Sequence, residues 1–509
     1  MEVSADGWDL VLRGGRVIDP ESGLDAVRDV AVAAGRIAAV GTGLTARAAG
    51  GDVDVAGQVV TAGFIDLHSH VSDLGGLRLQ AMDGVTTALE LEAGVTPVAQ
   101  AYRRAADEGR PINYGFAASW ALARMEAVAG LAADASLGAF MARISDPAWQ
   151  RPAEPAQVGA LLARLAEDLA EGALGIGVLL GYAPAASPAE YLRVAGLAAE
   201  AGVPTFTHAR DLIEMVPATL ADGAEEIVRA AAETGAHMHY CHVNSTSQRH
   251  IDRVLGLVGR AQAAGSRVTT EAYPYGSGMT GIGAAFLAPE RLGERSLSPS
   301  SLTYAPTGER VASADRLREL RAADPGGLVI IDLLSEDDPV DRALLMRSLT
   351  FPGAVVASDA MPLTWTAPPA DPQAWPLPPT AFTHPRTAGT FSRALRLLTR
   401  EGPLTRGGPL TTPGPLGLSD ALAKCSLEPA RLLQDRVPAL RGKGRLRPGS
   451  DADIVVFDPA AITDQASYSH STRPSAGIRH VLVNGAFVVR DAEIVASARP
   501  GRPVRAEPR

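Results

Sequence analysis

Ala62-Gly63-Phe64-Ile65-Asp66-Leu67-His68-Ser69-His70 is the stretch that decides the fold, an apolar run that ends in two histidines. In an extended strand, side chains two residues apart lie on the same face, so His68 and His70 are expected to point the same way. One metal ion can take a nitrogen atom from each of them. Alone, the pair is equally consistent with two ordinary polar residues at a strand end, so the rest of the chain has to supply further ligands.

The composition is that of a large globular protein. The chain has 509 residues, 46% of them apolar, and a net charge of -10, so we expect more than one domain. No basic patch alternates with aromatic residues, which argues against nucleic acid and anionic membranes as partners. The sequence shows no secretory signal and no apolar run near the roughly 20 residues of a bilayer span. Its two cysteines, Cys241 and Cys425, are too few for a disulfide framework, so we predict a cytoplasmic protein.

Both ends of the chain have the texture of short β-strands. Residues 8–60 contain β-branched and alternating segments that are separated by glycine- and proline-containing turns. Residues 453–489 repeat this pattern, and Asn484-Gly485 suits a type I′ hairpin. Neither end makes a credible sheet protein alone. We therefore predict one small β-sandwich built from residues 1–61 and 441–509.

Between these ends, strand-like and helix-like segments alternate from residue 62 to residue 440. Such alternation predicts a parallel sheet with crossover helices. The candidate strands are 63–70, 85–92, 112–118, 173–180, 204–208, 236–243, 267–273 and 354–359. Eight is the strand number of a closed barrel, so the predicted fold class is α/β, a (β/α)8 TIM-like barrel flanked by the β-sandwich.

Two segments interrupt the alternation. The first is an insertion at about 288–350, which begins with a stretch rich in Ser, Pro and Arg. The second, 362–385, holds eight prolines together with Trp365 and Trp375. Because loops that follow barrel strands lie on the active-site face, we predict that 362–385 is a lid, with a mobile surface excursion as the alternative.

Four of the ten histidines end candidate strands: His68, His70, His208 and His242. The eighth strand ends at Asp359, and in a barrel all these strand ends converge. Four imidazoles and a carboxylate suit zinc, which binds nitrogen and oxygen donors and keeps a position open for water in catalytic sites. On the sixth strand, His237 and His239 lie on the face opposite His242, and we expect them to be structural.

Several of these segments resemble a known family. The stretch from Gly63 to His70 is similar to the first-strand signature of the amidohydrolase superfamily, and further segments resemble the N-acyl-D-amino-acid deacylases (D-aminoacylases). Those segments are Gly84-Val85-Thr86-Thr87, Gly172-Ala173-Leu174-Gly175, His208-Ala209-Arg210, Glu271-Ala272-Tyr273-Pro274-Tyr275, Ser358-Asp359, His384-Pro385-Arg386 and Arg447-Pro448-Gly449-Ser450. The resemblance spans nearly the whole chain.

The resemblance implies a metal centre with a role for each matching residue. One zinc ion would be held by His208 and His242 with a bridging ligand, and a second site would lie at His68 and His70. Asp359 would be the general acid/base. Zinc can lower the pKa of bound water toward about 7, and a carboxylate beside that water can take its proton and return it to the leaving amine.

The chain departs from the family at the second strand. Where the family usually has a cysteine ligand, this sequence reads Glu90-Leu91-Glu92. The bridging lysine of related amidohydrolases is not available, because the only lysines are Lys424 in a late helix and Lys443 near the C-terminal sandwich. We predict Glu92, nearest the strand end, as the oxygen ligand, with Glu90 one pleat behind it as the alternative. A carboxylate makes the site harder and could favour two metal ions.

The resemblance also implies contacts to the substrate. Arg386 matches the family arginine that binds the substrate α-carboxylate, for which a planar bidentate donor is suited. Tyr273 and Tyr182 are candidates for wall or hydrogen-bonding residues. Asn244 stands where the family commonly has a lysine, two residues past the sixth-strand histidine, and is a further candidate contact.

The implied function is zinc-dependent hydrolysis of the amide bond of an N-acyl-amino acid, with one or two zinc ions per chain. Metal-bound hydroxide would attack the acyl carbonyl while Asp359 moves the proton. The D configuration follows from the resemblance alone. Two alternatives stay open: hydrolysis of a cyclic amide or specialised-metabolite amide at the same metal site, and a non-catalytic protein on the same scaffold.

Overall fold

A ring of eight parallel strands forms the centre of the computed structural model, which describes residues 8–507 except 48–50, 133 and 402–411. Along the ring the strands are β6 (Phe64–Asp66), β7 (Val85–Val95), β8 (Asn113–Ser119), β9 (Ile176–Leu179), β10 (Pro204–His208), β11 (His237–Tyr240), β12 (Val268–Ala272) and β17 (Ala354–Val356). The backbone of Ala360 closes the ring, because its carbonyl accepts from the His70 amide at 2.8 Å. All eight predicted strands overlap an observed one, so the barrel prediction is confirmed.

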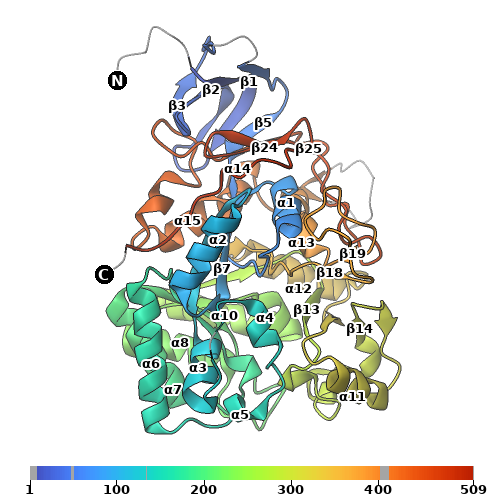
Figure 1. The fold of residues 1–509 in the computed structure, drawn as a ribbon. Coiled ribbons are helices and arrows are strands. Elements are labelled where there is room, and N and C mark those ends of the chain that lie inside the picture. Colours follow the sequence, from blue (N-terminus) through green and yellow to red (C-terminus); the bar gives the residue numbers. More distant parts are fainter. Residues whose placement is uncertain (1–7, 48–50, 133, 402–411, 508–509) are drawn as a thin grey trace.

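Helices cover the outside of the ring (Figure 1). They include α1 (Leu74–Met82), α2 (Val98–Glu108), α3 (Trp120–Ala129), α6 (Pro155–Ala170), α7 (Pro188–Ala201), α8 (Gly223–Thr234), α10 (Ile251–Ala263), α12 (Pro339–Thr350) and α13 (Arg386–Thr399). Local sequence sets their ends: Ser187 caps α7 by accepting from the Glu190 amide, and Gly202 ends it at a φ of 65°. No helix of the described ranges is long and apolar enough to cross a bilayer.

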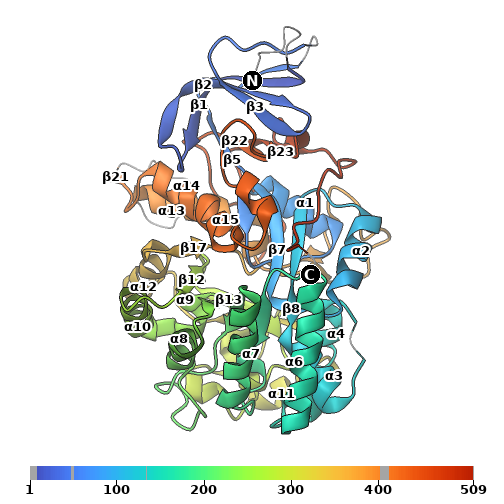
Figure 2. The same cartoon turned by 90° about the vertical axis from the view of Figure 1, so that its left-hand side faces the viewer.

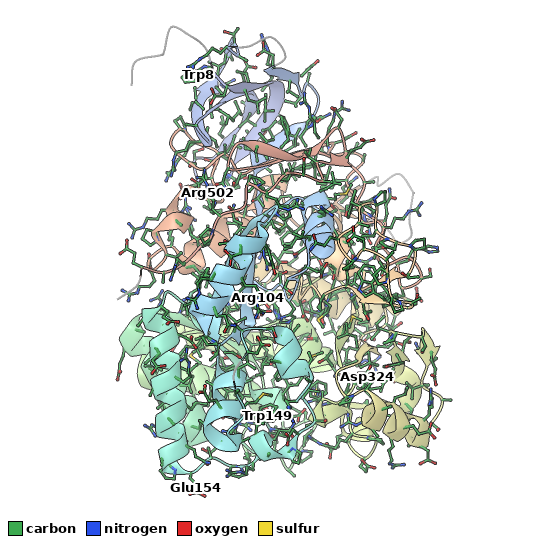
Figure 3. The ribbon with its side chains drawn as sticks, viewed as in Figure 1. Trp8, Arg104, Trp149, Glu154, Asp324 and Arg502 are labelled. Carbon is green, nitrogen blue, oxygen red and sulfur yellow. The ribbon has the colours of Figure 1, made fainter. Side chains whose placement is uncertain are left out.

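The side chains drawn in Figure 3 include both buried and exposed residues. Trp149 is fully buried and its ring packs against Phe140 at a centroid distance of 6.0 Å. Arg104 and Glu154 are exposed on the surface. Burial of aromatic rings among the outer helices therefore stabilises the shell around the barrel.

The two chain ends share one nine-stranded sheet that folds into the sandwich beside the barrel (Figure 2). Its strands are β1 (Leu10–Asp19), β2 (Leu24–Ala33), β3 (Arg36–Gly41), β4 (Asp52–Asp54), β5 (Val59–Ala62), β22 (Ile454–Phe457), β23 (Ile478–Val483), β24 (Ala486–Arg490) and β25 (Glu493–Ile494). Antiparallel pairing of β22 with β5 joins the ends. The tail then leaves this sheet, because the Val504 amide donates to Tyr114 of β8 at 2.7 Å and the Ala506 amide to Gly172 at 3.1 Å.

An inserted subdomain separates β12 from β17. It is a four-stranded antiparallel sheet of β13 (Ser277–Gly281), β16 (Leu328–Asp332), β14 (Leu302–Tyr304) and β15 (Glu309–Arg310), with α11 (Ala314–Ala323) beside it. The insertion begins earlier than the expected residue 288, since β13 holds two glycines and no β-branched run to mark it as a strand. The last part of the expected range, α12, is the crossover helix that leads to β17.

The proline-rich segment 362–385 packs on the outside of the barrel. It contains a short hairpin of β18 (Thr364–Trp365) and β19 (Ala381–Phe382). Apolar side chains of the segment, Leu363, Trp375 and Leu377, pack around Leu79 of α1. The carbonyl of Gln373 also accepts a hydrogen bond from Arg78 of α1 at 2.7 Å.

Candidate metal centre and active site

One carboxylate meets four imidazoles at the carboxyl ends of the strands. Glu92 Oε1 lies 2.9 Å from His208 Nδ1 and 2.6 Å from His242 Nε2. Its Oε2 lies 3.2 Å from His68 Nε2 and 3.5 Å from His70 Nε2. The two oxygens of Glu92 thus face different histidine pairs, as a ligand between two metal ions would.

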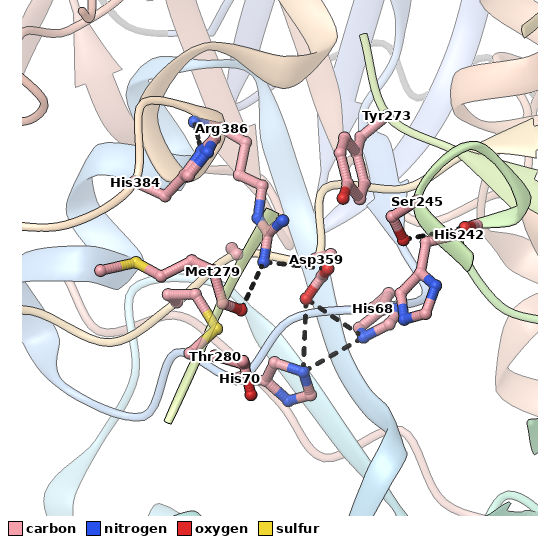
Figure 4. Close-up of polar contacts among 12 residues, drawn as sticks. His68, His70, His242, Ser245, Tyr273, Met279, Thr280, Asp359, His384 and Arg386 are labelled. Carbon is pink, nitrogen blue, oxygen red and sulfur yellow. Dashed lines mark hydrogen bonds and ion pairs between the residues drawn. The ribbon is translucent and has the colours of Figure 1, made fainter. Parts of the chain in front are cut away.

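Asp359 faces the same cluster from the eighth strand (Figure 4). Its Oδ1 lies 3.5 Å from His68 Nε2 and 3.5 Å from His70 Nε2, and its Oδ2 forms an ion pair with Arg386 Nη2 at 2.9 Å. The structure therefore brings together the five predicted metal ligands, the predicted acid/base and the predicted arginine.

Unusual backbone geometry aims two of these side chains. His242 has a φ of 33° and Asp359 a φ of 50°, in the left-handed region that residues other than glycine rarely adopt. Both lie just past the end of their strand, so the chain turns at that point and the side chain faces the barrel mouth. Gly177 of β9 allows a close approach, because a Cβ there would lie 2.2 Å from the Glu92 carbonyl oxygen.

Burial and charge shift the pKa values of the cluster. Burial lowers the pKa of His68, but the negative charges of Glu92, Glu271 and Asp359 outweigh it and raise that pKa well above its usual value. Burial raises the pKa of Asp359, yet the charges of Arg386 and His68 leave it below its usual value. The carboxylate of Asp359 is therefore held ionised in a buried place, and such a charge favours a divalent cation beside it.

The donor set fits zinc. His68 Nε2 and His70 Nε2 lie 3.1 Å apart, while the Nδ1 atom of each ring faces a carboxylate, Glu271 or Glu90. In a neutral imidazole with its proton on Nδ1, Nε2 has a lone pair that can bind a zinc ion, so the two Nε2 atoms are suited to share one cation. Three groups of ligand atoms lie close enough together to hold a single ion: His68 with Glu92 and His242, His68 with His70 and Asp359, and His68 with Cys241 and Glu271.

A cavity of about 80 Å³ adjoins this cluster. Its wall includes Tyr273, whose hydroxyl is buried and has no hydrogen-bond partner among the described residues. Arg386 lies over the Tyr273 ring at 4.7 Å, fully buried, and its Nε and Nη1 atoms likewise lack partners there. Gly278 adds no side chain beside these groups. Arg386 is not itself among the lining residues, but its free donors and the Tyr273 hydroxyl together make a candidate site for an anion.

Tyr182 and Asn244 take different positions. Tyr182 lines the cavity, its hydroxyl lies 2.7 Å from Thr280 Oγ1, and its ring packs on His208 at 4.9 Å. Asn244 Nδ2 donates to the Tyr273 carbonyl at 3.3 Å, and its Oδ1 accepts from the Tyr273 amide at 3.4 Å. Asn244 thus holds the backbone behind the wall and is not one of the residues that line the cavity.

Sequence reasoning gave no site role to three residues that lie near the cluster. Glu271, near the end of β12, contacts His68, and its position at a strand end could have indicated it. His239, expected to be structural, contacts Glu271 at 3.0 Å. Arg295 lines the cavity, pairs with Asp211 and lies over the Phe286 ring at 4.3 Å, and no motif marked it.

The segment that covers the cavity also differs from the expected lid. Phe286, Leu287, Arg295 and Leu297 of the inserted subdomain line it. No residue of 362–385, all of which the structure describes, is part of that lining. Leu363, Trp375 and Leu377 of the Pro-rich segment pack against α1, while Phe382 packs behind the wall residues Met279 and Met361.

A parallel α/β barrel with an imidazole–carboxylate cluster at the strand ends defines a class of metal-dependent hydrolases. The family described as "Amidohydrolase family" matches residues 53–489. An N-acyl-D-glutamate deacylase of Alcaligenes xylosoxydans xylosoxydans is 30% identical over 98% of this chain and 96% of its own. A D-aminoacylase of the same organism is 31% identical over 94% of each chain.

Solved structures agree with these relatives. The N-acyl-D-glutamate deacylase from Bordetella bronchiseptica, complexed with zinc and a phosphonate inhibitor, has a TM-score of 0.73 at 26% identity and covers 98% of this chain and 100% of its own. A D-aminoacylase structure with a TM-score of 0.73 at 24% identity shares the fold, with the same coverage. The chain belongs to the amidohydrolase family and, within it, to the N-acyl-D-amino-acid deacylases.

Proposed function

We propose that this protein hydrolyses the amide bond of N-acyl-D-amino acids with zinc at the Glu92 cluster. The observation that carries the proposal is the pairing of a metal-ligand cluster with an anion site, joined through the 2.9 Å contact of Asp359 and Arg386. An N-acyl-amino acid has a scissile amide for the first and an α-carboxylate for the second. Related chains named as deacylases of N-acyl-D-amino acids support this choice.

His208 and His242 would hold one zinc ion, and His68 and His70 a second, with Glu92 between them. Zinc held there supplies acidified water and a polarised carbonyl. Asp359 takes a proton from the attacking water on Oδ1 and returns it to the leaving amine. The guanidinium of Arg386 beside it favours the ionised form of Asp359, which can accept that proton.

Arg386 divides its donors between two tasks. Nη2 contacts Asp359, which leaves Nε and Nη1 for the substrate carboxylate. The Tyr273 hydroxyl adds a third donor. This arrangement fixes the distance between the carboxylate and the reacting amide, and it disfavours a neutral cyclic amide, which would leave the buried donors unpaired.

The other walls of the cavity are mainly apolar, with Phe140, Phe286, Leu297 and Ile331 among the lining residues. The charge of Arg295 is matched by Asp211. These walls favour an apolar acyl group or amino-acid side chain. A location in the cytoplasm is part of the proposal. The two cysteines are free and buried, as expected in a reducing compartment.

The test is release of free amino acid by zinc-loaded protein from a panel of N-acetyl-D- and N-acetyl-L-amino acids with apolar and acidic side chains. We expect turnover of D substrates, most rapidly those with apolar side chains. No turnover of any N-acyl-D-amino acid would overturn the proposal. Cyclic imides in the same panel test the alternative substrate, and turnover of these alone would assign the site to it.

A further inference from the structure

Each of the two first-strand histidines has a carboxylate behind it. His68 Nδ1 contacts Glu271 Oε1, and His70 Nδ1 lies 2.8 Å from Glu90 Oε2. All four side chains are buried. The Nε2 atoms, on the far side of each ring, face Glu92 and Asp359.

Glu271 is itself held from behind. Its Oε2 lies 3.0 Å from His239 Nε2, and its Oε1 accepts from the His242 amide at 3.3 Å. His239 Nδ1 lies 2.8 Å from Thr269 Oγ1. A carboxylate only accepts, so His239 donates from Nε2, and its Nδ1 then accepts from the Thr269 hydroxyl. The contacts with His239 and with the His242 amide together fix the orientation of the Glu271 carboxylate.

Glu90 has fewer contacts than Glu271. Its Oε2 contacts His70, and its buried Oε1 has no hydrogen-bond partner within the described ranges. Glu90 and Glu92 are two residues apart on β7, so the same strand supplies a carboxylate behind the ring of His70 and one in front of it.

We propose that Glu271 and Glu90 are positioning residues that hold His68 and His70 with the proton on Nδ1 and the Nε2 lone pair aimed at zinc. The inference rests on the proposed metal site. A carboxylate that accepts from the second ring nitrogen fixes the tautomer and the ring orientation and makes the ligand more basic. Loss of such a partner typically weakens metal binding by about 10- to 100-fold.

The variants Glu271→Gln and Glu90→Gln test this, since glutamine keeps the volume and one acceptor but removes the charge. Zinc content per chain and zinc affinity, measured by competition with a chelator, are expected to show weakening of about 10- to 100-fold at unchanged fold by circular dichroism. Asp83→Asn is the matched control, because Asp83 is a buried carboxyl whose contacts are the amides of Phe391 and Ser392 and the hydroxyl of Ser475. Its zinc affinity is expected to equal that of the wild type.

Unchanged zinc content and affinity in both variants would overturn the inference. If Glu271→Gln does not fold, Glu90→Gln decides alone, because it tests the same arrangement at His70. The measurement uses no substrate. A wild type that binds zinc but cleaves no N-acyl-D-amino acid would therefore overturn the proposed function and leave this inference standing.

Discussion

In the proposed metal centre Glu92 is the shared ligand, because its two oxygens reach both histidine pairs. Glu92→Ala should remove the carboxylate shared by the two histidine pairs and lower both zinc content and kcat/KM by more than about 100-fold. This is more than the loss of a residue that only hydrogen-bonds to a metal ligand usually costs. Glu90→Ala should cost less. Atomic absorption and amino-acid release measure both, and the reverse order would transfer the ligand role to Glu90.

The hydroxyl of Tyr273 gives a second prediction at this scale. Tyr273→Phe keeps the ring under Arg386 but removes a buried donor that has no partner in the described structure. A hydrogen bond to a charged group contributes about 1.5–3 kcal/mol, so KM should rise at least about tenfold while the melting temperature stays unchanged. An unchanged KM would show that this hydroxyl does not bind the carboxylate.

Sequence could place the candidate ligands but not the residues that orient them. His68, His70, His208, His242 and Asp359 each end a predicted strand, and a barrel brings strand ends together. The sequence named Glu90 only as an alternative oxygen ligand and gave Glu271 no role, because the positioning role proposed for them depends on contacts across strands, and these follow from register and ring orientation. Asn244 is a different case. The resemblance suggested a substrate contact, but its side chain hydrogen-bonds the backbone of Tyr273 and does not line the cavity.

At the scale of elements, the regular barrel strands were predictable, whereas the insertion was predicted only from about residue 288 and its first strand, β13, was missed. Strands such as β7 and β17 carry β-branched or apolar runs between turns. The sequence of β13 has no such run, and β13 is a strand because it pairs with β16. The segment 362–385 misled for a physical reason. Its position after a barrel strand suggested a lid, but Leu363, Trp375 and Leu377 pack on α1, and no residue of the segment lines the cavity.

Two variants distinguish these elements. Trp375→Ala should lower the melting temperature by a few degrees, because it removes half-buried packing worth about 2 kcal/mol, and should leave KM unchanged. Phe286→Ala should raise KM, because Phe286 lines the cavity. A raised KM in Trp375→Ala would restore the lid interpretation of 362–385.

At the scale of the whole molecule, buried charge joins the sandwich to the barrel. Lys443 Nζ lies 2.6 Å from Asp453 Oδ2, and Asn113 of β8 donates to the same oxygen at 2.9 Å. Lys443 also pairs with Asp451 Oδ2 at 3.0 Å, so Asp453→Ala removes one of its two carboxylate partners and should cost about 1.5–3 kcal/mol of unfolding free energy, measured by denaturant titration. A loss below about 1 kcal/mol would show that the junction contributes little.

Asp83 links α1, α13 and the C-terminal segment, and burial raises its pKa from 3.8 to about 7. In the unfolded chain this carboxyl ionises at about pH 4, whereas in the folded protein it keeps its proton up to about pH 7. The unfolded state is therefore favoured more as the pH rises, and the stability that protonated Asp83 contributes is lost progressively from about pH 4 through about 7. Between pH 5 and pH 8 the loss should be about 3 kcal/mol. The Asp83→Asn variant has no ionisable group at this position. In zinc-saturated protein, its unfolding free energy should therefore fall by about 3 kcal/mol less than that of the wild type between pH 5 and pH 8. Parallel pH profiles for wild type and variant would show that Asp83 is not the group that makes stability depend on pH.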